Sequence, residues 1–342
     1  MYISVEFELI QVLSLDVIEG FIKTHIYLKF QWTDELIQWN ITKNSACFRF
    51  ERSKVWTPDI VIQNSLDYVP HLGFDSQPVS ISYQGMVLFE VQVKPETACS
   101  MDVTRFPFDQ QTCVVIISSN NYYAYELYMN PFVVYDGVLI QNGEWDVVGV
   151  TADNETELTQ IYHGHYKSVA ITLNRRHLYY VVNLLLPMLL ISSLNPTVFL
   201  VKADTGEKLS TSLALFLSFT MFLSILSGML PQTSTSSSLV SLYVCVQLHL
   251  SGLYVIVCIL IIRVSNMKEL NTVTRFIAKC TIRTNRVRQI TGKETTGSPD
   301  STSETDVTTL HDVSDKMDRF CFFVSVTIHL ILTTLLVYFI TL

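Results

Sequence analysis

Residues 99–113 read Cys-Ser-Met-Asp-Val-Thr-Arg-Phe-Pro-Phe-Asp-Gln-Gln-Thr-Cys, so two cysteines lie with thirteen residues between them. Two cysteines at this spacing can close a small ring in an oxidising compartment. Phe106 and Phe108 flank Pro107, which would give that ring an apolar tip. An exposed apolar tip needs a surface to pack against. The alternative is an ordinary surface loop closed by a disulfide, and the cysteines alone leave both interpretations open.

The composition of the chain is divided between two halves. Of its 342 residues, 49% are hydrophobic and 16% are charged, which is too apolar for an ordinary soluble domain. Residues 1–174 carry 21 acidic and 9 basic side chains, whereas residues 175–342 carry 10 acidic and 14 basic ones. An acidic first half would enrich cations near it, although a generic acidic surface is the alternative. We therefore expect two domains.

The first half has the pattern of strands and turns. Residues 3–9 and 25–30 alternate apolar and polar side chains, and Leu72-Gly73 and Asn142-Gly143 supply turns. Many short strands without a helical period predict an antiparallel β-sandwich over residues 1–176. Met1 leads directly into such a strand, so we expect any secretory leader to have been removed ahead of it.

The second half contains four long apolar runs, at residues 178–201, 208–230, 239–263 and 317–342. Each is long enough to cross a hydrocarbon core of about 30 Å, which takes roughly 20 helical residues. Residues 263–293 carry eight basic side chains against the single acid Glu269, so we expect residues 264–316 to form a cytoplasmic loop with helical and disordered parts. The strand-rich domain and the C-terminus then lie outside the cell, on a multi-pass protein of the plasma membrane.

Two observations agree with this orientation. N-glycosylation sequons begin at Asn40 and Asn154, both in the predicted outer half, and a disulfide between Cys99 and Cys113 is chemically reasonable there. The remaining cysteines are interpreted as unpaired thiols, namely Cys47, Cys245, Cys258, Cys280 and Cys321. No metal-type spacing connects them, so we expect neither a metal site nor a cofactor.

The second apolar run has a helical periodicity. One helical face holds six residues spaced by 4, 3, 4, 3 and 4, namely Ser210, Ala214, Leu217, Met221, Ser224 and Gly228. Polar residues at both ends and large apolar ones in the middle are typical of a gate that closes by dewetting. Serines that hydrogen-bond across a helix bundle are the alternative. Glu207 precedes Ser210 by one turn, so a symmetric ring of subunits would place a cation-selecting ring of carboxylates there.

Several motifs along the chain resemble those of one receptor family. They are Phe-Pro-Phe-Asp at residues 106–109, Trp56-Thr57-Pro58-Asp59, Gly143-Glu144-Trp145, Gly206-Glu207-Lys208 and the stretch 175–183. On these motifs the chain resembles a subunit of the Cys-loop receptors, the pentameric ligand-gated ion channels, as an invertebrate-like member of the cationic branch that includes acetylcholine and serotonin receptors. The resemblance implies an extracellular sandwich, a four-helix transmembrane bundle and a homo- or heteropentamer embedded in membrane lipids.

The resemblance also assigns roles in the pore. Gly206-Glu207-Lys208 resembles the motif of cation-selective subunits, whereas anion-selective relatives carry a Pro-Ala-Arg pattern there, so Na⁺ and K⁺ are the expected permeant ions. Leu217 matches the leucine of the family's hydrophobic gate. Gly228 departs from the pattern, because many cation channels have an acidic residue at that position.

In this family the Cys loop transmits ligand binding to the pore. The resemblance implies that Asp109 pairs with Arg175 ahead of the first span, although simple positive flanking of a span is the alternative for Arg175. The residues expected to contact the linker 229–238 are Phe106, Pro107 and Phe108, with Glu19 as a weaker candidate.

Ligands of these receptors bind between neighbouring subunits in a cage of aromatic rings, which suits a cationic ligand. The candidate positions here are Tyr27, Gln63, Phe89, Asn120, Tyr122, Tyr162 and Tyr166. Gln63 and Asn120 stand where acetylcholine receptors have aromatic residues. The loop expected to cap the ligand, around Tyr162 and Tyr166, lacks the pair of adjacent cysteines found in acetylcholine-binding subunits. We therefore expect a small extracellular ligand that is not a conventional neurotransmitter, while an ordinary sandwich surface is the alternative for each tyrosine.

His163 and His165 permit a metal or proton-sensing interpretation. A His-x-His pair on a strand puts both rings on one face, where they could hold zinc with a third ligand or titrate near neutral pH. Exposed loop histidines are the alternative.

The functional prediction is a channel and not an enzyme. The sequence has no Gly-rich phosphate loop, metal tetrad or nucleophile elbow, and basic residues beside a span do not indicate nucleic acid. We predict a ligand-gated, cation-selective channel subunit in which agonist binding is coupled through the Cys loop to a pore lined by the second helix. The alternative is a non-conducting accessory subunit that requires a partner subunit. The polar stripe favours the channel, whereas Gly228 and the incomplete aromatic cage favour the accessory subunit.

Overall fold

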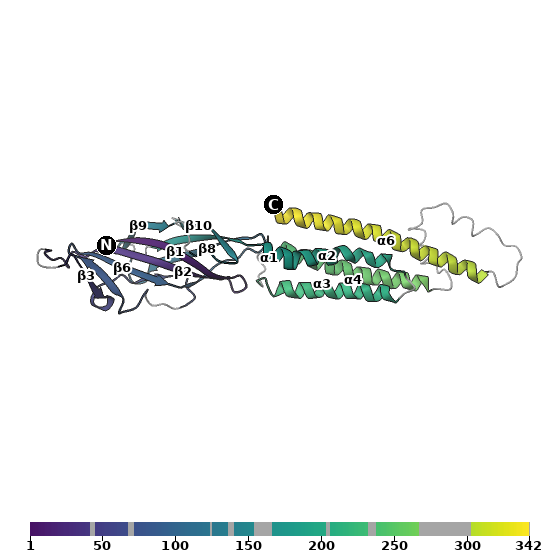
Figure 1. Cartoon of the computed structure of the whole chain (residues 1–342), viewed down its shortest axis with the longest axis horizontal. Helices are drawn as coiled ribbons and strands as arrows, with labels where there is room; N and C mark the ends of the chain where they lie inside the picture. Colours follow the sequence, from purple (N-terminus) through teal and green to yellow (C-terminus); the bar gives the residue numbers. More distant parts are fainter. Residues whose placement is uncertain are drawn as a thin grey trace. The chain divides into compact units, whose positions relative to one another are not determined.

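The computed structural model describes residues 1–41, 45–67, 72–123, 125–135, 140–153, 166–202, 206–231, 237–266 and 302–341, with residues 302–313 and 341 described by their backbone alone. The chain divides into two units. The first comprises Met1–His177 with Met229–Ser236, and the second comprises Leu178–Gly228 with Ser237–Leu342. Strands make up the first unit and helices the second (Figure 1).

The first unit is a sandwich of two sheets. The larger sheet has the strand order β3 (Cys47–Glu51), β5 (Pro78–Ser82), β6 (Met86–Val93), β2 (Phe21–Thr33), β1 (Tyr2–Asp16) and β9 (Tyr128–Tyr135), and β7 (Glu96–Ala98) pairs with β2. The smaller sheet has the order β10 (Trp145–Asp153), β11 (Tyr166–Arg175), β8 (Gln110–Ser119) and β4 (Ile60–Ile62). A short 3-10 turn, η1 (Arg52–Lys54), follows β3. The sandwich predicted from the sequence is confirmed.

One strand pair departs from the predicted antiparallel arrangement. β1 and β9 run parallel, with Val5 opposite Phe132. β9 follows β8, which belongs to the other sheet, so β9 reaches the larger sheet by a crossover and is not tied to the direction that a hairpin imposes. The alternation of side chains gives no information about strand direction, which is why the sequence did not predict this pair.

The core of the sandwich follows from side-chain alternation. In β2, Ile22, Thr24, Ile26 and Leu28 are each 0% exposed, while the alternate residues Lys23, His25 and Tyr27 are half-buried. Burial of each such apolar side chain contributes roughly 1.5–3 kcal/mol. The turn between β5 and β6 needs Gly85, whose φ is +82°, because a Cβ there would overlap the Asp34 carbonyl oxygen.

Among the described residues of the second unit, four helical segments are long and apolar enough to cross a membrane. The first, Leu178–Leu200, joins α1 (Leu178–Tyr180), the π-helical η3 (Val181–Leu185), α2 (Leu186–Leu194) and the 3-10 helix η4 (Asn195–Leu200). The others are α3 (Glu207–Ser227), α4 (Leu239–Ser265) and the apolar part, Ser314–Ile340, of α6 (Thr302–Thr341). The four membrane helices predicted from the sequence are therefore present, and α6 extends beyond the apolar run at its N-terminal end.

Two prolines account for the irregular winding of the first span. Pro187 lies at the start of α2 and Pro196 at the start of η4. Proline has no amide N–H, so each removes one hydrogen bond to the preceding turn and disfavours regular α-helix there.

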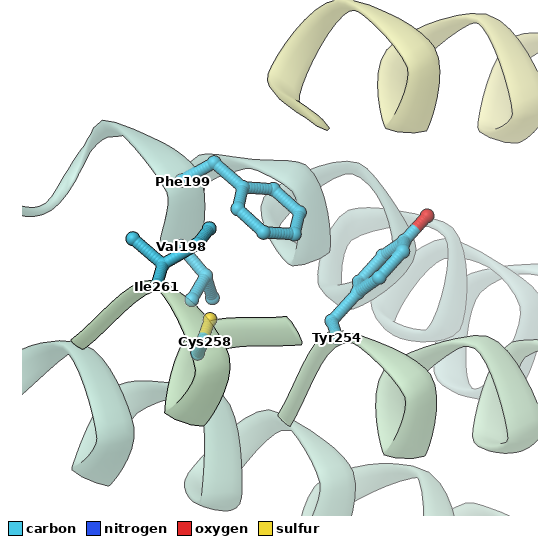
Figure 2. Packing of buried hydrophobic residues seen from close by; sticks show 5 residues of the cluster. All are labelled: Val198, Phe199, Tyr254, Cys258 and Ile261. Atoms are coloured by element: carbon cyan, nitrogen blue, oxygen red, sulfur yellow. The ribbon is translucent and has the colours of Figure 1, made fainter. Parts of the chain in front are cut away.

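A buried apolar cluster, which we call the Cys258 cluster, holds the four spans together. It comprises Val198, Phe199, Tyr254, Cys258 and Ile261, from η4 and α4 (Figure 2). The rings of Phe199 and Tyr254 lie 5.3 Å apart in an edge-to-face arrangement. Partly buried side chains from α3 and α6 pack against this cluster, so all four spans share one core.

Candidate functional sites

The loop from Cys99 to Cys113 is closed by a disulfide bond. The Phe106–Pro107 peptide bond is cis. Phe108 is 39% exposed, whereas Phe106 is 2% exposed and Pro107 is buried. The apolar tip is therefore narrower than the sequence predicted, because Phe106 packs inward and only Phe108 offers its ring to a partner.

Hydrogen bonds within the loop fix its shape. The Thr104 hydroxyl and N–H donate to Asp102 Oδ1 at 2.6 and 3.0 Å, and they hold the pKa of that carboxyl below its usual range. Gln111 Nε2 donates to the Asp102 carbonyl oxygen at 2.7 Å and to Asp109 Oδ2 at 2.6 Å. Because the pKa of Asp102 is depressed, its contribution to stability is present above its ordinary pKa and is lost as the pH falls through the depressed value.

Arg175, at the end of β11, is surrounded by partners. Its Nε and Nη2 donate to the two Asp109 carboxylate oxygens at 2.8 and 3.1 Å, and Nη1 donates to Glu144 Oε1 at 3.0 Å. The guanidinium carbon lies 4.2 Å from the ring centroid of Trp145 and 5.1 Å from that of Phe106. Arg175 is 6% exposed and Asp109 is 4% exposed, so the ion pair is removed from water.

The contact between Asp109 and Arg175 that the resemblance implied is therefore present, and it is more specific than the flanking of a span requires. Glu144 and Trp145 were not predicted as its partners. They reach it because β10 pairs with β11 in a register that puts Trp145 opposite Arg175, and no local spacing encodes that register. Glu19 lies exposed in the turn after β1, where its N–H donates to Asp16 Oδ1 at 2.9 Å.

Removal of the disulfide is expected to destabilise the first unit. Replacing Cys99 and Cys113 by serine opens a loop of sequence separation 14, and a cross-link of this loop length contributes about 3 kcal/mol. Thermal unfolding of the 342-residue chain in detergent measures the effect. Cys47→Ser is the matched control, since Cys47 is exposed and has no disulfide partner. Equal unfolding temperatures for the double variant and the parent would contradict the expectation.

The candidate ligand residues lie on different sheets. Tyr27 is on β2 of the larger sheet and donates to Glu90 Oε1 at 2.5 Å. Partial burial and this hydrogen bond raise the pKa of Tyr27, so its hydroxyl remains a neutral donor. Gln63 follows β4 of the smaller sheet, where its Oε1 accepts from the Ser118 hydroxyl at 2.9 Å. In the described part of the chain no contact joins Tyr27 to Gln63.

Trp56 and Tyr122 form an aromatic pair that was not predicted as a pair. Trp56 Nε1 donates to the Tyr122 hydroxyl at 3.1 Å, and the ring centroids are 6.0 Å apart. The Asp59 carboxylate holds the loop in place, because it accepts from the Ser119 hydroxyl at 2.5 Å and the Asn121 N–H at 2.8 Å. Trp56 is 40% exposed, so the pair is accessible. The sequence signal that could have pointed to this pair is the motif Trp56-Thr57-Pro58-Asp59.

The remaining ligand candidates differ in accessibility. Phe89 is 3% exposed, lies 6.0 Å from the ring of Phe30 and is covered by the Arg52 guanidinium at 5.2 Å. A ring enclosed in this way belongs to the core and offers no face to a ligand, so Phe89 is not a ligand-binding candidate. Asn120 is exposed, and Tyr166 is 9% exposed. Asn40 is exposed, whereas Asn154, Tyr162, His163 and His165 lie outside the described residues.

α3 has one buried side and one exposed side. The buried residues are Lys208, Ser212, Phe219 and Leu226. All seven residues predicted to line a pore are exposed in the single chain, namely Glu207, Ser210, Ala214, Leu217, Met221, Ser224 and Gly228. Leu217 is 59% and Met221 66% exposed. This side of α3 is therefore available to a pore or to a neighbouring subunit.

Lys208 and Asp318 form a buried ion pair between α3 and α6. The side chains are 0% and 9% exposed, and Lys208 Nζ lies 6.0 Å from the Phe199 ring centroid. This pair was not predicted. The sequence signal that could have revealed it is Asp318, an acidic residue inside the predicted fourth apolar run, because an ionised group at such a position needs a counter-charge. Across the described ranges, no group of three or more His, Cys, Asp or Glu side chains could hold a metal ion.

Family models match both units of the chain. Residues 1–177 match the neurotransmitter-gated ion-channel ligand binding domain, and residues 184–318 match the neurotransmitter-gated ion-channel transmembrane region. The chain therefore belongs to the neurotransmitter-gated ion-channel family, which is a family of channels and not of enzymes. It is a multi-pass protein of the plasma membrane, with its ligand-binding domain outside the cell.

The relatives confirm the predicted resemblance to acetylcholine-receptor-like Cys-loop subunits. The chain is 27% identical to rat acetylcholine receptor subunit beta over 282 residues, which cover 76% of this chain and 55% of the relative. It is 31% identical to Drosophila melanogaster acetylcholine receptor subunit beta-like 1 over 266 residues, 74% of this chain and 50% of the relative. Rat neuronal acetylcholine receptor subunit beta-4 is 28% identical over 290 residues, 81% of this chain and 57% of the relative. The chain thus spans about half the length of these relatives.

Proposed function

We propose that the chain is a subunit of a ligand-gated, cation-selective channel that assembles as a homo- or heteropentamer around a pore lined by α3. The observation that carries this proposal is the exposed side of α3, where Ser210 and Ser224 flank the apolar Leu217 and Met221. Large apolar side chains between small polar ones form a constriction that gates by dewetting when several copies surround an axis. Family membership supports the assembly.

The charge at the start of α3 supports cation selectivity. Glu207 is exposed, whereas the adjacent Lys208 is fully buried and neutralised by Asp318. Gly206-Glu207-Lys208 therefore presents a single negative charge to the exterior of the subunit. A ring of such carboxylates would attract Na⁺ and K⁺ and repel anions.

The separation of the candidate residues supports ligand binding between two subunits. Tyr27 lies on the larger sheet, while Gln63 and the pair Trp56 and Tyr122 flank the smaller one. One subunit would supply Tyr27 and its neighbour the other three, with exposed Asn120 at the same loop as Tyr122. Gln63 is an amide already engaged by Ser118, so the ligand would meet a more polar surface than an all-aromatic cage offers.

The Cys loop is the proposed coupling element. Its exposed ring, Phe108, lies 4.6 Å from the ring of His177, the last residue before the first span. The buried pair of Asp109 and Arg175 fixes the loop to the end of β11. A displacement of the smaller sheet would therefore move Phe108 and the start of the first span together.

Replacement of Glu207 by glutamine is expected to reduce the preference for cations over anions. The variants are made in a Leu217→Ser background, in which the polar residue at the gate position favours wetting of the constriction. This background should allow ion current without added agonist. The measurement is the reversal potential in cells expressing this chain when external NaCl is diluted. Glu207→Asp is the control, since it keeps the charge and should keep the selectivity. A reversal potential that follows chloride, or one that Glu207→Gln leaves unchanged, would defeat the role of Glu207.

A non-conducting accessory subunit is the second candidate function. Gln63 and Asn120 in place of aromatic residues and the uncharged Gly228 at the outer end of the pore stripe favour it. Recording from cells that express the chain alone, during a screen of ligands, pH and divalent ions, separates the two. Silence of surface pentamers, even with Leu217→Ser, together with current only after co-expression of a related subunit, would favour the accessory role.

A further inference from the structure

Buried polar side chains line the contact between α4 and the first span. Two hydrogen bonds cross this contact. The Ser192 and Tyr243 hydroxyls are 2.8 Å apart, and the Ser251 hydroxyl donates to Asn195 Oδ1 at 3.4 Å. All four residues are buried. The polar surfaces of the two helices therefore face each other inside the bundle.

Gln247 lies on α4 between these two hydrogen bonds, one turn after Tyr243 and one turn before Ser251. It is 0% exposed, and among the residues that the structure describes neither its Oε1 nor its Nε2 has a hydrogen-bond partner. The Tyr243 hydroxyl lies near this amide, but without the geometry of a hydrogen bond. Asn195 Nδ2 also lacks a partner within the described ranges. Two amides with unmet hydrogen-bonding groups thus face the same contact.

The surroundings of these amides restrict what can complete their hydrogen bonds. A buried donor or acceptor without a partner is unfavourable, because it has lost the water that it bound in the unfolded chain. Lipid and a neighbouring subunit do not reach Gln247 or Asn195, since both are enclosed within the single chain. The nearby hydroxyls and amides carry no negative charge to neutralise a cation inside the bundle. A small neutral molecule that donates and accepts hydrogen bonds therefore fits this place.

We propose that internal water bridges Gln247 and Asn195 inside the bundle. The water accepts hydrogen bonds from Asn195 Nδ2 and Gln247 Nε2 and donates to Gln247 Oε1. A buried water molecule typically makes about three hydrogen bonds to polar groups that lack other partners, and these atoms supply them. The bridge ties α4 to the first span in addition to the apolar packing of the Cys258 cluster. The proposal does not rest on channel activity, because the water can be detected in a silent protein.

Radiolytic footprinting tests for this water. A short X-ray pulse produces hydroxyl radicals from internal water as well as from bulk solvent, and the radicals modify the side chains next to which they form. The 342-residue chain is irradiated in lipid nanodiscs, and peptide mass spectrometry locates the modified residues. We expect modification of Tyr243 despite its burial, because its hydroxyl lies near the Gln247 amide. Phe199, a similarly buried ring in the apolar Cys258 cluster, should remain unmodified, and the exposed Tyr125 should be modified in every sample.

Variants decide whether the radicals come from this site. Gln247→Leu, which replaces the amide by an apolar side chain of similar size, should abolish the modification of Tyr243, and Asn195→Leu should do the same. His249→Gln is the matched control, since it changes an exposed residue of α4 and should leave the modification intact. Thermal unfolding identifies the variants that remain folded. A parent in which Tyr243 is as unreactive as Phe199 would overturn the proposal whatever the variants do, and so would modification of Tyr243 that persists unchanged in folded Gln247→Leu.

Discussion

Replacement of Arg175 by alanine is expected to abolish delivery of the chain to the cell surface. The change leaves the Asp109 carboxylate, which is 4% exposed, without its bidentate partner. Loss of one member of a buried ion pair costs about 3–5 kcal/mol, because the remaining charge stays away from water. The rings of Trp145 and Phe106 also lose the guanidinium that packs on them. A loss of this size is a large part of the total stability of a typical domain, which is about 5–15 kcal/mol.

The neighbouring Arg176 provides a matched control. Arg176 pairs with Asp146 at 2.5 Å, but these side chains are 40% and 55% exposed, so water screens the pair. Arg176→Ala should therefore leave surface delivery close to that of the parent. Arg175→Lys should give intermediate surface delivery, because lysine keeps the positive charge but lacks the planar guanidinium that donates to both Asp109 oxygens. Surface biotinylation and thermal unfolding in detergent measure the series, and equal behaviour of Arg175→Ala and Arg176→Ala would refute the buried pair as the cause.

Separation of Lys208 from Asp318 is expected to have a comparable effect on the second unit. Lys208→Met leaves a carboxylate whose side chain is 9% exposed without a counter-charge, and Asp318→Leu leaves an ammonium that is fully buried. Either single change should cost about 3–5 kcal/mol of unfolding free energy. The two changes together remove both charges and should recover most of the loss, since apolar side chains of similar volume can replace a buried pair.

This double-mutant cycle is tested by thermal unfolding in detergent of the parent, the two single variants and the double variant. The parent and the double variant should unfold at similar temperatures, and both single variants well below them. Glu207→Gln, one residue before Lys208, should leave the unfolding temperature unchanged because Glu207 is exposed. A double variant as unstable as the sum of the single ones would show that the two charges do not depend on each other.

The features predicted from the sequence were those with a local signature. Alternation over 3–9 predicted a strand whose apolar side chains Ile3, Val5, Phe7 and Leu9 are all 0% exposed. The polar and apolar spacing of α3 predicted the residues that prove exposed on it. In these two cases a short stretch contains the periodicity that determines the structure. The contact of Asp109 with Arg175 joins residues 66 apart in the chain, and it was expected only because the resemblance to the receptor family implied it.

The features that escaped prediction depend on which distant segments pair. Glu144 and Trp145 reach Arg175 through the register of β10 against β11, and Asp318 reaches Lys208 through the packing of α6 against α3. Phe89, predicted as a ligand residue, is enclosed by Arg52 and Phe30, which are distant from it in the sequence. Spacing along the chain contains no information about such long-range pairs, because many registers satisfy the same alternation.

The Cys258 cluster limits how α3 can move. Side chains from all four spans meet at this cluster, and Lys208 is bound to α6 near the cytoplasmic end. Close-packed interiors resist gradual deformation, so α3 cannot slide or bend alone without opening cavities beside Phe199 and Tyr254. In the proposed channel, opening would therefore proceed as a tilt of each four-helix bundle as one body, and the pore radius would change through the angle between subunits.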